Sequence, residues 1–470
     1  MPARHCLSAL ALAFALAPTF ASAGPLSYDE AWLRVQGSDR IAAARAAVEH
    51  KAALGEGFRH LGGPSVSVFG SALRYSASLD VDLDPLNQRL AQLAGQLPIP
   101  LDQLPIPITL PSFPAKYTFR RSDSLAFAHV SAVWPIYLGG AADAVRGVIA
   151  GQKAEAEADL AQTEHESAGT LAQRYFGAQL ARRAAALRQT AVETIARHDA
   201  AAQRMLQRGV ISRVERLQAA AALEEARTNA RKAANDAELA ALALARLLKL
   251  PPAGDKPQPT TPLAVASQPL PPLNEFIGTA MNKHPGLAKV AAKKLQAEQL
   301  HEGSEALRRP QVFAFGQREL KDGRADWVAG IGVRVSLYDS LDHAALDRAG
   351  AAQIAQAEAT DAQARSDIAL LVEKQWRATE QARQQYLGMQ AAIELAQELV
   401  RLRTAGVREG TGTTLELIDA ETNLAKVQTE RAQVAYEYVM ALAGLLQACG
   451  EPERLGEMLA AADIRIENER

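Results

Sequence analysis

Apolar residues recur with two different periods along the chain, and each period predicts a different kind of structure. Every second residue from Trp327 to Leu337 is apolar, and most residues between them are small or polar. A period of two predicts a strand with one apolar face. Similar short runs start at Pro64 and Pro310, and a less regular run covers residues 123–136. We therefore expect four strands, with the last two joined by an Asp-Gly turn within residues 321–324.

Elsewhere the apolar positions recur at spacings of three and four over very long segments. Residues 139–207 and 341–407 contain no proline. Each segment would form a helix of about 100 Å, which needs partner helices along its length. The contact seam expected in the second segment comprises Ile368, Leu371, Gln375, Ala378, Ala382, Tyr386, Met389, Ile393, Ala396 and Val400. Returning helices over 213–250 and 414–449, and shorter helices over 26–58 and 274–307, would complete a coiled-coil barrel or bundle. The first short helix begins with the capping-box spacing of Ser27 and Glu30, and Lys283-His284-Pro285 should break the other into two.

The junction between strand and long helix occurs twice, at Tyr137 and at Tyr338. Setting these residues against each other gives an offset of 201 residues. The same offset aligns Gly209 with Gly410, Ser212 with Thr413, Glu215 with Glu416, Leu217 with Ile418 and Ala219 with Ala420. The sequence is therefore an internal duplication, whose two halves are expected to build one object.

The duplication suggests a division of the chain. Residues 1–23 have basic residues, an apolar run and an Ala-Ser-Ala end, as in a secretory signal. We expect a first repeat over 24–250, a Pro-rich linker over 251–272 outside the bundle, a second repeat over 273–450 and a charged tail over 451–470. The connection between the first two strands repeats Gln-Leu-Pro-Ile-Pro within 96–107, which indicates an extended surface loop.

Composition and motifs limit the classes of protein to which the chain can belong. Hydrophobic residues make up 48% of the chain but aromatic residues only 5%, which favours closely packed helices rich in Ala and Leu. The net charge of -2 gives no indication of nucleic-acid binding. Nine scattered His residues show no zinc-helix spacing, and neither a phosphate loop nor a nucleophile elbow is present. We therefore expect no enzyme, no metal site and no cofactor. No stretch after the signal is apolar enough for a spanning helix, so any membrane crossing would use the strands.

The order of these features resembles the outer-membrane efflux protein family, the TolC-like outer membrane factors. The motifs that carry the resemblance are the strand-to-helix junction over 135–140 and the two hairpin tips over 208–219 and 409–420. The resemblance implies a mainly α fold with transmembrane β: duplicated long helical hairpins form a periplasmic α-barrel. Four β-strands per chain would contribute to a trimeric 12-stranded β-barrel.

The resemblance also implies a role and partners. The chain would be the outer-membrane channel-tunnel of a tripartite efflux or type I secretion system, conducting substrates passively. It would form a homotrimer in outer-membrane lipid and dock onto a periplasmic adaptor and an inner-membrane pump. Trp134, Tyr137, Trp327 and Tyr338 would lie at the membrane interfaces. Gly209, Val210, Gly410 and Thr411 would dock onto the adaptor, although a helical hairpin needs glycine at its turn in any case.

The resemblance places Glu416 and Asp419 in an acidic ring at the periplasmic gate. Such a ring would favour cations and bind a divalent cation when closed. Glu416 has a second interpretation, because Thr413 and Glu416 have the spacing of a capping box, as do Ser212 and Glu215. Asp419 has no capping role, and we favour it as the gate residue.

A different class of protein fits part of this pattern. A periplasmic coiled-coil scaffold or adaptor would share the signal segment and the long hairpins. It would not need the aromatic-bounded strand that begins at Trp327. The alternation in that strand also fits half of a soluble sandwich, so membrane association separates the two classes.

Overall fold

The computed structural model describes residues 24–95, 112–251, 256–320, 323, 326–338 and 340–466. The expected signal segment, the Gln-Leu-Pro-Ile-Pro repeat and most of the 321–324 turn lie outside the described residues. The chain forms two compact units. One comprises Met1–Gly57, Arg146–Leu300 and Arg348–Arg470, and the other Phe58–Val145 and His301–Asp347. Both units therefore contain segments of both sequence repeats.

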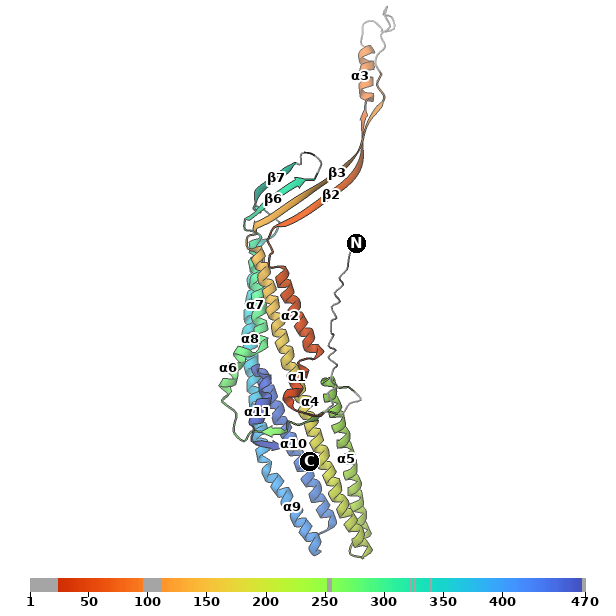
Figure 1. Cartoon of the computed structure of the whole chain (residues 1–470), viewed down its shortest axis with the longest axis vertical. Helices are drawn as coiled ribbons and strands as arrows, with labels where there is room; N and C mark the ends of the chain where they lie inside the picture. The colour runs from red at the N-terminus through yellow and green to blue at the C-terminus, as the bar shows by residue number, and fades with distance from the viewer. Residues whose placement is uncertain are drawn as a thin grey trace, which may run out of the picture. The chain divides into compact units, whose positions relative to one another are not determined.

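The second unit contains a four-stranded antiparallel sheet in the order β2-β3-β6-β7 (Figure 1). Its strands are β2 (Ser65–Asp82), β3 (Lys116–Tyr137), β6 (Gln311–Glu319) and β7 (Trp327–Arg334). All four alternating runs of the sequence form strands. Strand β7 ends at Arg334, not at Tyr338 as expected, because its partner β6 begins directly after Pro310, which has no amide hydrogen.

The first two strands are much longer than the sequence pattern suggests. They pair from Ser65 with Val133 to Asp82 with Lys116. Helix α3 (Asp84–Gly95) follows directly. The expectation of a loop between the two strands was therefore wrong for 74–82 and 116–122, which are strand.

The sheet has two unlike faces, because paired residues lie on the same side. We call one the apolar face; its members are Val66, Val68, Val130, Ala132, Trp134, Val312, Ala314, Trp327, Ala329, Ile331 and Val333. Many of these side chains are exposed, including Ile331 at 73% and Val68 at 69%. The polar face carries Ser65, Ser67, His129, Ser131, Gln317, Glu319 and Arg334, together with the apolar residues Phe69, Val133, Phe313, Phe315 and Val328. The rings of Phe313 and Phe315 lie over Gly332 and Gly330, where a Cβ would come within 2.5 and 3.1 Å of them.

The first unit is helical. Its helices are α1 (Tyr28–Val35), α2 (Asp39–Gly57), α5 (Arg213–Leu247), α6 (Leu273–Lys283), α9 (Gln390–Glu409), α10 (Thr414–Cys449) and α11 (Leu455–Ala461), with a 3-10 turn at Pro452–Arg454. Three further helices have residues in both units: α4 (Ala141–Gln207), α7 (Pro285–Ala306) and α8 (His343–Gly388). Among the described residues, no helix is apolar over a length that would cross a membrane.

The helix bounds largely follow the sequence, with two differences. Helix α4 is unbroken over 67 residues, and the expected break at Pro285 separates α6 from α7. The segment 26–58 divides into α1 and α2, and the long helix of the second repeat is interrupted at Met389, directly after Gly388. Glycine stabilises a helix poorly, which accounts for the position of the second break. The contact seam was wrong at Leu371, which is 39% exposed, whereas Val372 is fully buried.

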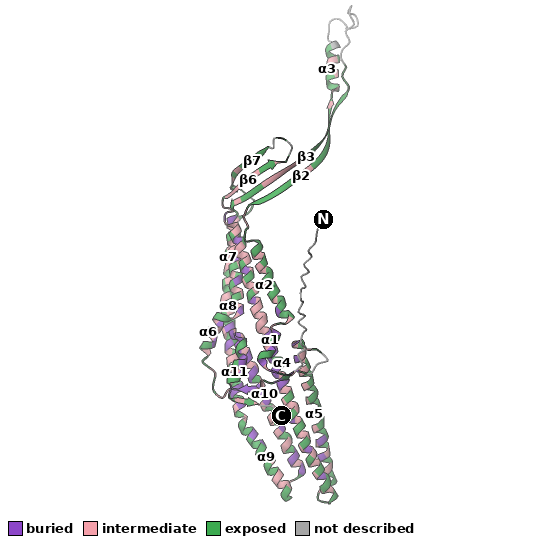
Figure 2. Ribbon diagram, in the orientation of Figure 1, coloured by how far each residue is buried: buried purple, intermediate pink, exposed green. Residues whose placement is uncertain are grey.

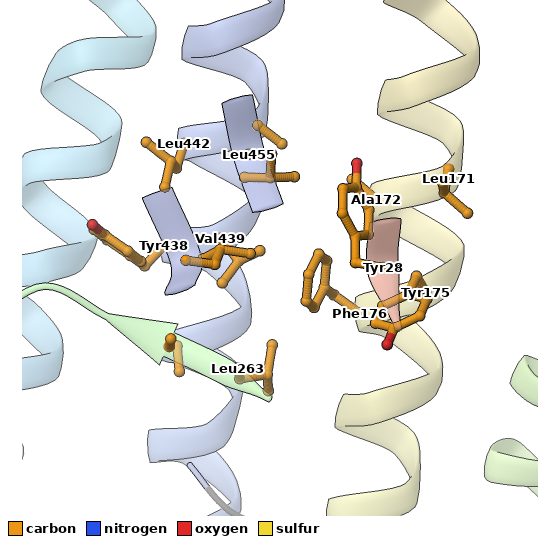
Figure 3. Close-up of a cluster of buried hydrophobic side chains, with 14 of the residues drawn as sticks. Tyr28, Leu171, Ala172, Tyr175, Phe176, Leu263, Tyr438, Val439, Leu442 and Leu455 are labelled. Carbon is orange, nitrogen blue, oxygen red and sulfur yellow. The ribbon is translucent and has the colours of Figure 1, made fainter. Parts of the chain in front are cut away.

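The core of the helical unit lies between α4 and α10 (Figure 3). The ring of Tyr28 stacks on Phe176 at 5.3 Å and meets Tyr175 edge-on at 5.5 Å. The hydroxyl of Tyr175 donates to the carbonyl of Leu26 at 2.6 Å and accepts from the amides of Thr260 and Thr261. Figure 2 shows the dense burial along α10 and the more exposed surfaces of α5 and α9.

The segment between the repeats is part of this core. Strand β4 (Gln258–Pro259) pairs with β1 (Pro25–Leu26), and β5 (Leu263–Val265) pairs with β8 (Ile464–Ile466). The expectation that this segment runs outside the bundle was wrong, because Leu263, Ala264 and Val265 are all buried. The tail after α10 is also packed into this core, because Leu455 and Leu459 of α11 belong to the same cluster.

Candidate functional site

The two helical hairpins of the first unit reverse at glycines with left-handed backbones. Gly209 has φ 72° after α4, and Gly410 has φ 75° after α9. This conformation costs an L side chain energy, so glycine suits both positions. Amides after each glycine close the helix end: Val210 donates to Met205 and Thr411 to Gly406, both at 2.9 Å. All four residues expected at the docking tips, Gly209, Val210, Gly410 and Thr411, are exposed.

The helices that return from these turns begin with different caps. At the first tip the Ser212 hydroxyl accepts from the Glu215 amide, and the Glu215 carboxylate accepts from the Ser212 amide at 2.7 Å. This is the complete capping box expected from the sequence. At the second tip the Thr413 hydroxyl accepts from the Glu416 amide at 3.2 Å. The carboxylate of Glu416 does not complete the box.

Glu416 pairs instead with Arg403 across the second hairpin. The Arg403 Nη1 donates to Glu416 Oε2 at 2.8 Å, linking α9 to α10. The interpretation of Glu416 as a capping carboxylate was therefore wrong. The residue that corresponds to Arg403 in the first repeat is Ala202, which is fully buried. Arg403 was missed from the sequence, although it and Glu416 lie on the two sides of the turn at Gly410.

Asp419 lies one helical turn further along α10 and is exposed. Its side chain makes no hydrogen bond or ion pair with another described residue. It lines a hollow of about 260 Å³ between α4, α5 and α10, which also contains Arg188, Glu225 and Asn229. The two candidate gate carboxylates therefore have different surroundings. Glu416 contacts α9, and Asp419 lies beside the first hairpin.

The tip of α10 packs on the first hairpin and so holds the two hairpins together. Ile418 is 1% exposed and belongs to a cluster with Ile195 and Ala202 of α4 and Ala219 and Leu223 of α5. Polar contacts accompany this cluster. His198 Nε2 lies 3.8 Å from Glu421 Oε1.

Three of the four aromatic residues expected at membrane interfaces, Trp134, Tyr137 and Trp327, lie near the ends of strands. Trp134 and Trp327 are on the apolar face, 50% and 74% exposed. Tyr137 pairs with Val312 after an irregularity in the β3 register, which brings it to the same face. Tyr338 lies beyond the end of β7 and is 90% exposed. Arg318 is paired with Trp327 at the far end of the apolar face.

The architecture matches a fold known from solved structures. Two long helical hairpins in one unit, and a four-stranded antiparallel sheet with an exposed apolar face in the other, form the fold of outer-membrane channels. Solved structures with this fold include CusC, which forms a transmembrane channel, with a TM-score of 0.71 and 14% identity. That match covers 90% of this chain and 91% of CusC. The open-state MtrE channel of Neisseria gonorrhoeae matches with a TM-score of 0.70 and 16% identity, covering 90% and 89% of the two chains.

The outer membrane protein VceC of Vibrio cholerae also matches, with a TM-score of 0.69 and 12% identity over 90% of this chain and 96% of VceC. Residues 110–248 match the family of outer membrane efflux proteins, which confirms the resemblance seen in the sequence. A sequence comparison with curated proteins gives no match.

Proposed function

We propose that this protein is the outer-membrane channel of a tripartite efflux or type I secretion system and conducts substrates passively as a homotrimer. The observation that carries the proposal is the sheet of the second unit. Its apolar face is exposed on β2, β3 and β7, and the outer edges of β2 and β7 pair with no other described strand. Exposed apolar faces and open edges require partners, which lipid and further copies of the chain would supply.

The number of strands sets the number of copies. Four strands are too few to enclose a lumen, whereas three copies would supply twelve and could close the four-stranded parts into one ring. The apolar face would contact lipid and the polar face would line the lumen. Trp134, Tyr137 and Trp327 would lie at the interfaces, where Arg318 can extend its charge into the headgroups. Because Tyr338 lies outside the strand, the proposal assigns it no interfacial position.

The helical unit would form the periplasmic tunnel. Its exposed tips at Gly209, Val210, Gly410 and Thr411 would dock onto a periplasmic adaptor, and an inner-membrane pump would supply the energy. Val210 is 65% exposed and Val214, the second residue of α5, is 64% exposed, so the first tip offers an apolar contact. Val210→Asp should abolish cross-linking to the adaptor and leave trimer formation unchanged. Unchanged cross-linking would place docking elsewhere.

For the gate we propose Asp419 as the main carboxylate. Arg403 partly neutralises Glu416, whereas Asp419 forms no direct ion pair with another described residue. A ring of three such carboxylates attracts cations and weakens as salt screens it. Such a mouth would hold a divalent cation in its closed state.

Conductance of the purified protein in a planar bilayer tests this proposal. We expect cation-selective steps that divalent cations block from one side only, and Asp419→Asn should remove most of that block. Glu215→Gln is the matched control, because it removes a carboxylate at the first tip that is engaged in capping. Equal block in Asp419→Asn and the parent protein would exclude Asp419 as the gate.

Fractionation separates the channel from a periplasmic scaffold. A channel would stay with the outer membrane after washing with salt or urea, and a scaffold would be released. The scaffold leaves the apolar face of the sheet without a partner, which is why the channel is preferred. Release by washing, together with failure to conduct, would overturn the proposal.

A further inference from the structure

The hairpin of β2 and β3 extends well beyond the four-stranded part of the sheet. Strand β6 pairs with β3 only between His129 and Tyr137. Strands β2 and β3 continue as a pair from Leu73 with Leu125 to Asp82 with Lys116. We call these residues, 73–82 and 116–125, the outer ribbon. At about 3.3 Å per residue it adds about 30 Å to the sheet, and neither of its outer edges pairs with another described strand.

The apolar side of the hairpin changes at the start of the outer ribbon. In the four-stranded part, Val66 and Val68 of β2 lie on the apolar face, and Ser65 and Ser67 lie on the polar face. In the outer ribbon the alternation is reversed. The side continuous with the polar face now carries Leu73, Tyr75, Ala77, Leu79, Val81, Tyr117, Phe119 and Leu125, and we call it the ribbon face. The opposite side carries Arg74, Ser76, Ser78, Asp80 and Asp82, with Lys116, Thr118 and Arg120.

The ribbon face is exposed in the single chain. Leu79 is 65% exposed, Phe119 57% and Tyr117 49%. Lipid does not suit this surface, because a tilted strand crosses the hydrocarbon in about 9–11 residues and β2 has 18. The ribbon face also lies on the side of the lumen, not on the side that would meet lipid. Apolar side chains on the lumen side of a strand pair need protein to cover them.

The charges on the ribbon face favour further copies of the same chain. Arg121 pairs with the small Ala77, and Asp123 lies two residues away on the same face. Arg121 makes no ion pair with another described residue, and Asp123 accepts only from the amide of Ser124. A basic and an acidic group side by side on one face are complementary to the same face of an identical neighbour.

The far end of the outer ribbon is closed by specific hydrogen bonds. The Asn87 amide group on α3 donates to the Phe113 carbonyl at 2.7 Å and accepts from the Phe113 amide at 3.1 Å. Leu83 also donates to the carbonyl of Ala115 at 2.9 Å. These contacts hold the two strands in register up to their end, so the ribbon presents a defined surface.

We propose that the three outer ribbons of the trimer pack together through their ribbon faces around the channel axis, on the outer side of the membrane. The inference rests on the proposed trimeric channel. Two-stranded ribbons twist strongly, so three of them keep one face inward by winding around one another. Arg121 of each copy then pairs with Asp123 of a neighbour, and the assembled ribbons narrow the outer mouth of the channel.

Disulfide cross-linking tests the packing directly. Ala77→Cys places a thiol on the ribbon face, and Ser76→Cys is the matched control on the opposite side of the same strand. The natural Cys449 is 1% exposed, so the parent protein serves as the background. After mild oxidation we expect most Ala77→Cys protein to run as a covalent dimer on a non-reducing gel, and Ser76→Cys and the parent to remain monomeric.

The mass of the detergent-solubilised particle and its conductance are measured on the same samples. A conducting trimer in which Ala77→Cys is not cross-linked overturns the ribbon packing and leaves the proposed function intact. Equal cross-linking of Ala77→Cys and Ser76→Cys also overturns it, because the contact would have no preferred side. A protein that neither trimerises nor conducts refutes the proposed function, and the ribbon packing fails with it.

Charge reversal supplies a second test. Arg121→Asp in the Ala77→Cys protein should lower the cross-linking yield severalfold, because it places like charges together. Adding Asp123→Arg should restore the yield by exchanging the two charges. A yield that is the same in all three proteins would refute the pairing of Arg121 with Asp123.

Discussion

The two helical hairpins arose from one duplicated sequence and keep the same turn, but they use it differently. Both reverse at a left-handed glycine, Gly209 or Gly410. In the first hairpin, Glu215 caps its own helix and Arg216 pairs with Asp199. In the second hairpin, the Glu416 carboxylate takes no part in the cap and binds Arg403 across the hairpin. The comparison shows that the repeat preserves the backbone turn, while the charges around it have changed roles.

Burial at the aligned pair Leu217 and Ile418 gives the largest expected difference between the hairpins. Ile418 is 1% exposed and Leu217 is 59% exposed. Ile418→Ala should lower the free energy of unfolding by about 2–5 kcal/mol, as for other large buried apolar residues. Leu217→Ala should change it by about 0.5 kcal/mol or less. Urea unfolding measures both, and equal losses would show that Leu217 is buried between copies in the assembly.

The two turns should respond equally to loss of glycine. Gly209→Ala and Gly410→Ala each place a Cβ on a left-handed backbone, which costs roughly 1–2 kcal/mol. Nothing lies within 4 Å of an added Cβ at either position, so no further clash is expected. Thermal unfolding of the two variants gives the comparison. Gly388→Ala is the control, because its helical backbone should make the change neutral or stabilising.

The ion pairs near the two tips should differ in strength. Asp199 and Arg216 are 15% and 21% exposed, whereas Glu416 and Arg403 are 44% and 48% exposed. Exposed ion pairs are worth about 0.2–1 kcal/mol, so the coupling of Arg403 with Glu416 should fall in that range. The coupling of Asp199 with Arg216 should be larger. Double-mutant cycles with alanine measure both coupling energies. A larger coupling for Arg403 with Glu416 would contradict the expectation that the more buried pair is the stronger one.

The smallest expected effect is the change of stability with pH, in which the two repeats should again differ. His165 of α4 is aligned with Ser366 of α8. Burial lowers the pKa of His165, and the carboxylates of Glu453 and Glu164 oppose that shift. Burial also lowers the pKa of the neighbouring His284, as does the charge of His165.

Because the unfolded chain binds these protons more readily, stability should fall as the pH drops below about 6.5. His165→Gln should reduce that fall between pH 7 and pH 5, as followed by urea unfolding. Ser366→Ala should leave the pH dependence unchanged. If His165→Gln lost as much stability between pH 7 and pH 5 as the parent protein, other groups would be responsible for the loss.

The sequence predicts the regular parts of this molecule well. The capping boxes at Ser27 and Ser212, the break at Pro285 and the bounds of α10 all follow from local signals that act within one turn. The glycine turns were also located correctly, because only a few residue types adopt a left-handed backbone.

The features that were missed depend on contacts between distant segments. The outer ribbon escaped detection because its apolar residues change sides after Ala72, so the period of two does not stay in phase. Strand β5 has only three residues, too few for a periodic signal, and its burial depends on β8 about 200 residues later. Arg403 looked like one of many charges on a long helix until the hairpin brought it to Glu416.

The pairing of the middle segment with both ends of the described chain has a consequence for the history of the protein. A duplicated chain would be expected to split most easily between its two repeats. A split between β4 and β5 would leave both strand pairs within their own halves, but it would divide one core, because Leu263 and Val265 belong to the same cluster as Tyr28 and Tyr175. Half-length chains would therefore have to rebuild that core between separate molecules. The shared core thus keeps the two repeats in one chain and lets the hairpins specialise.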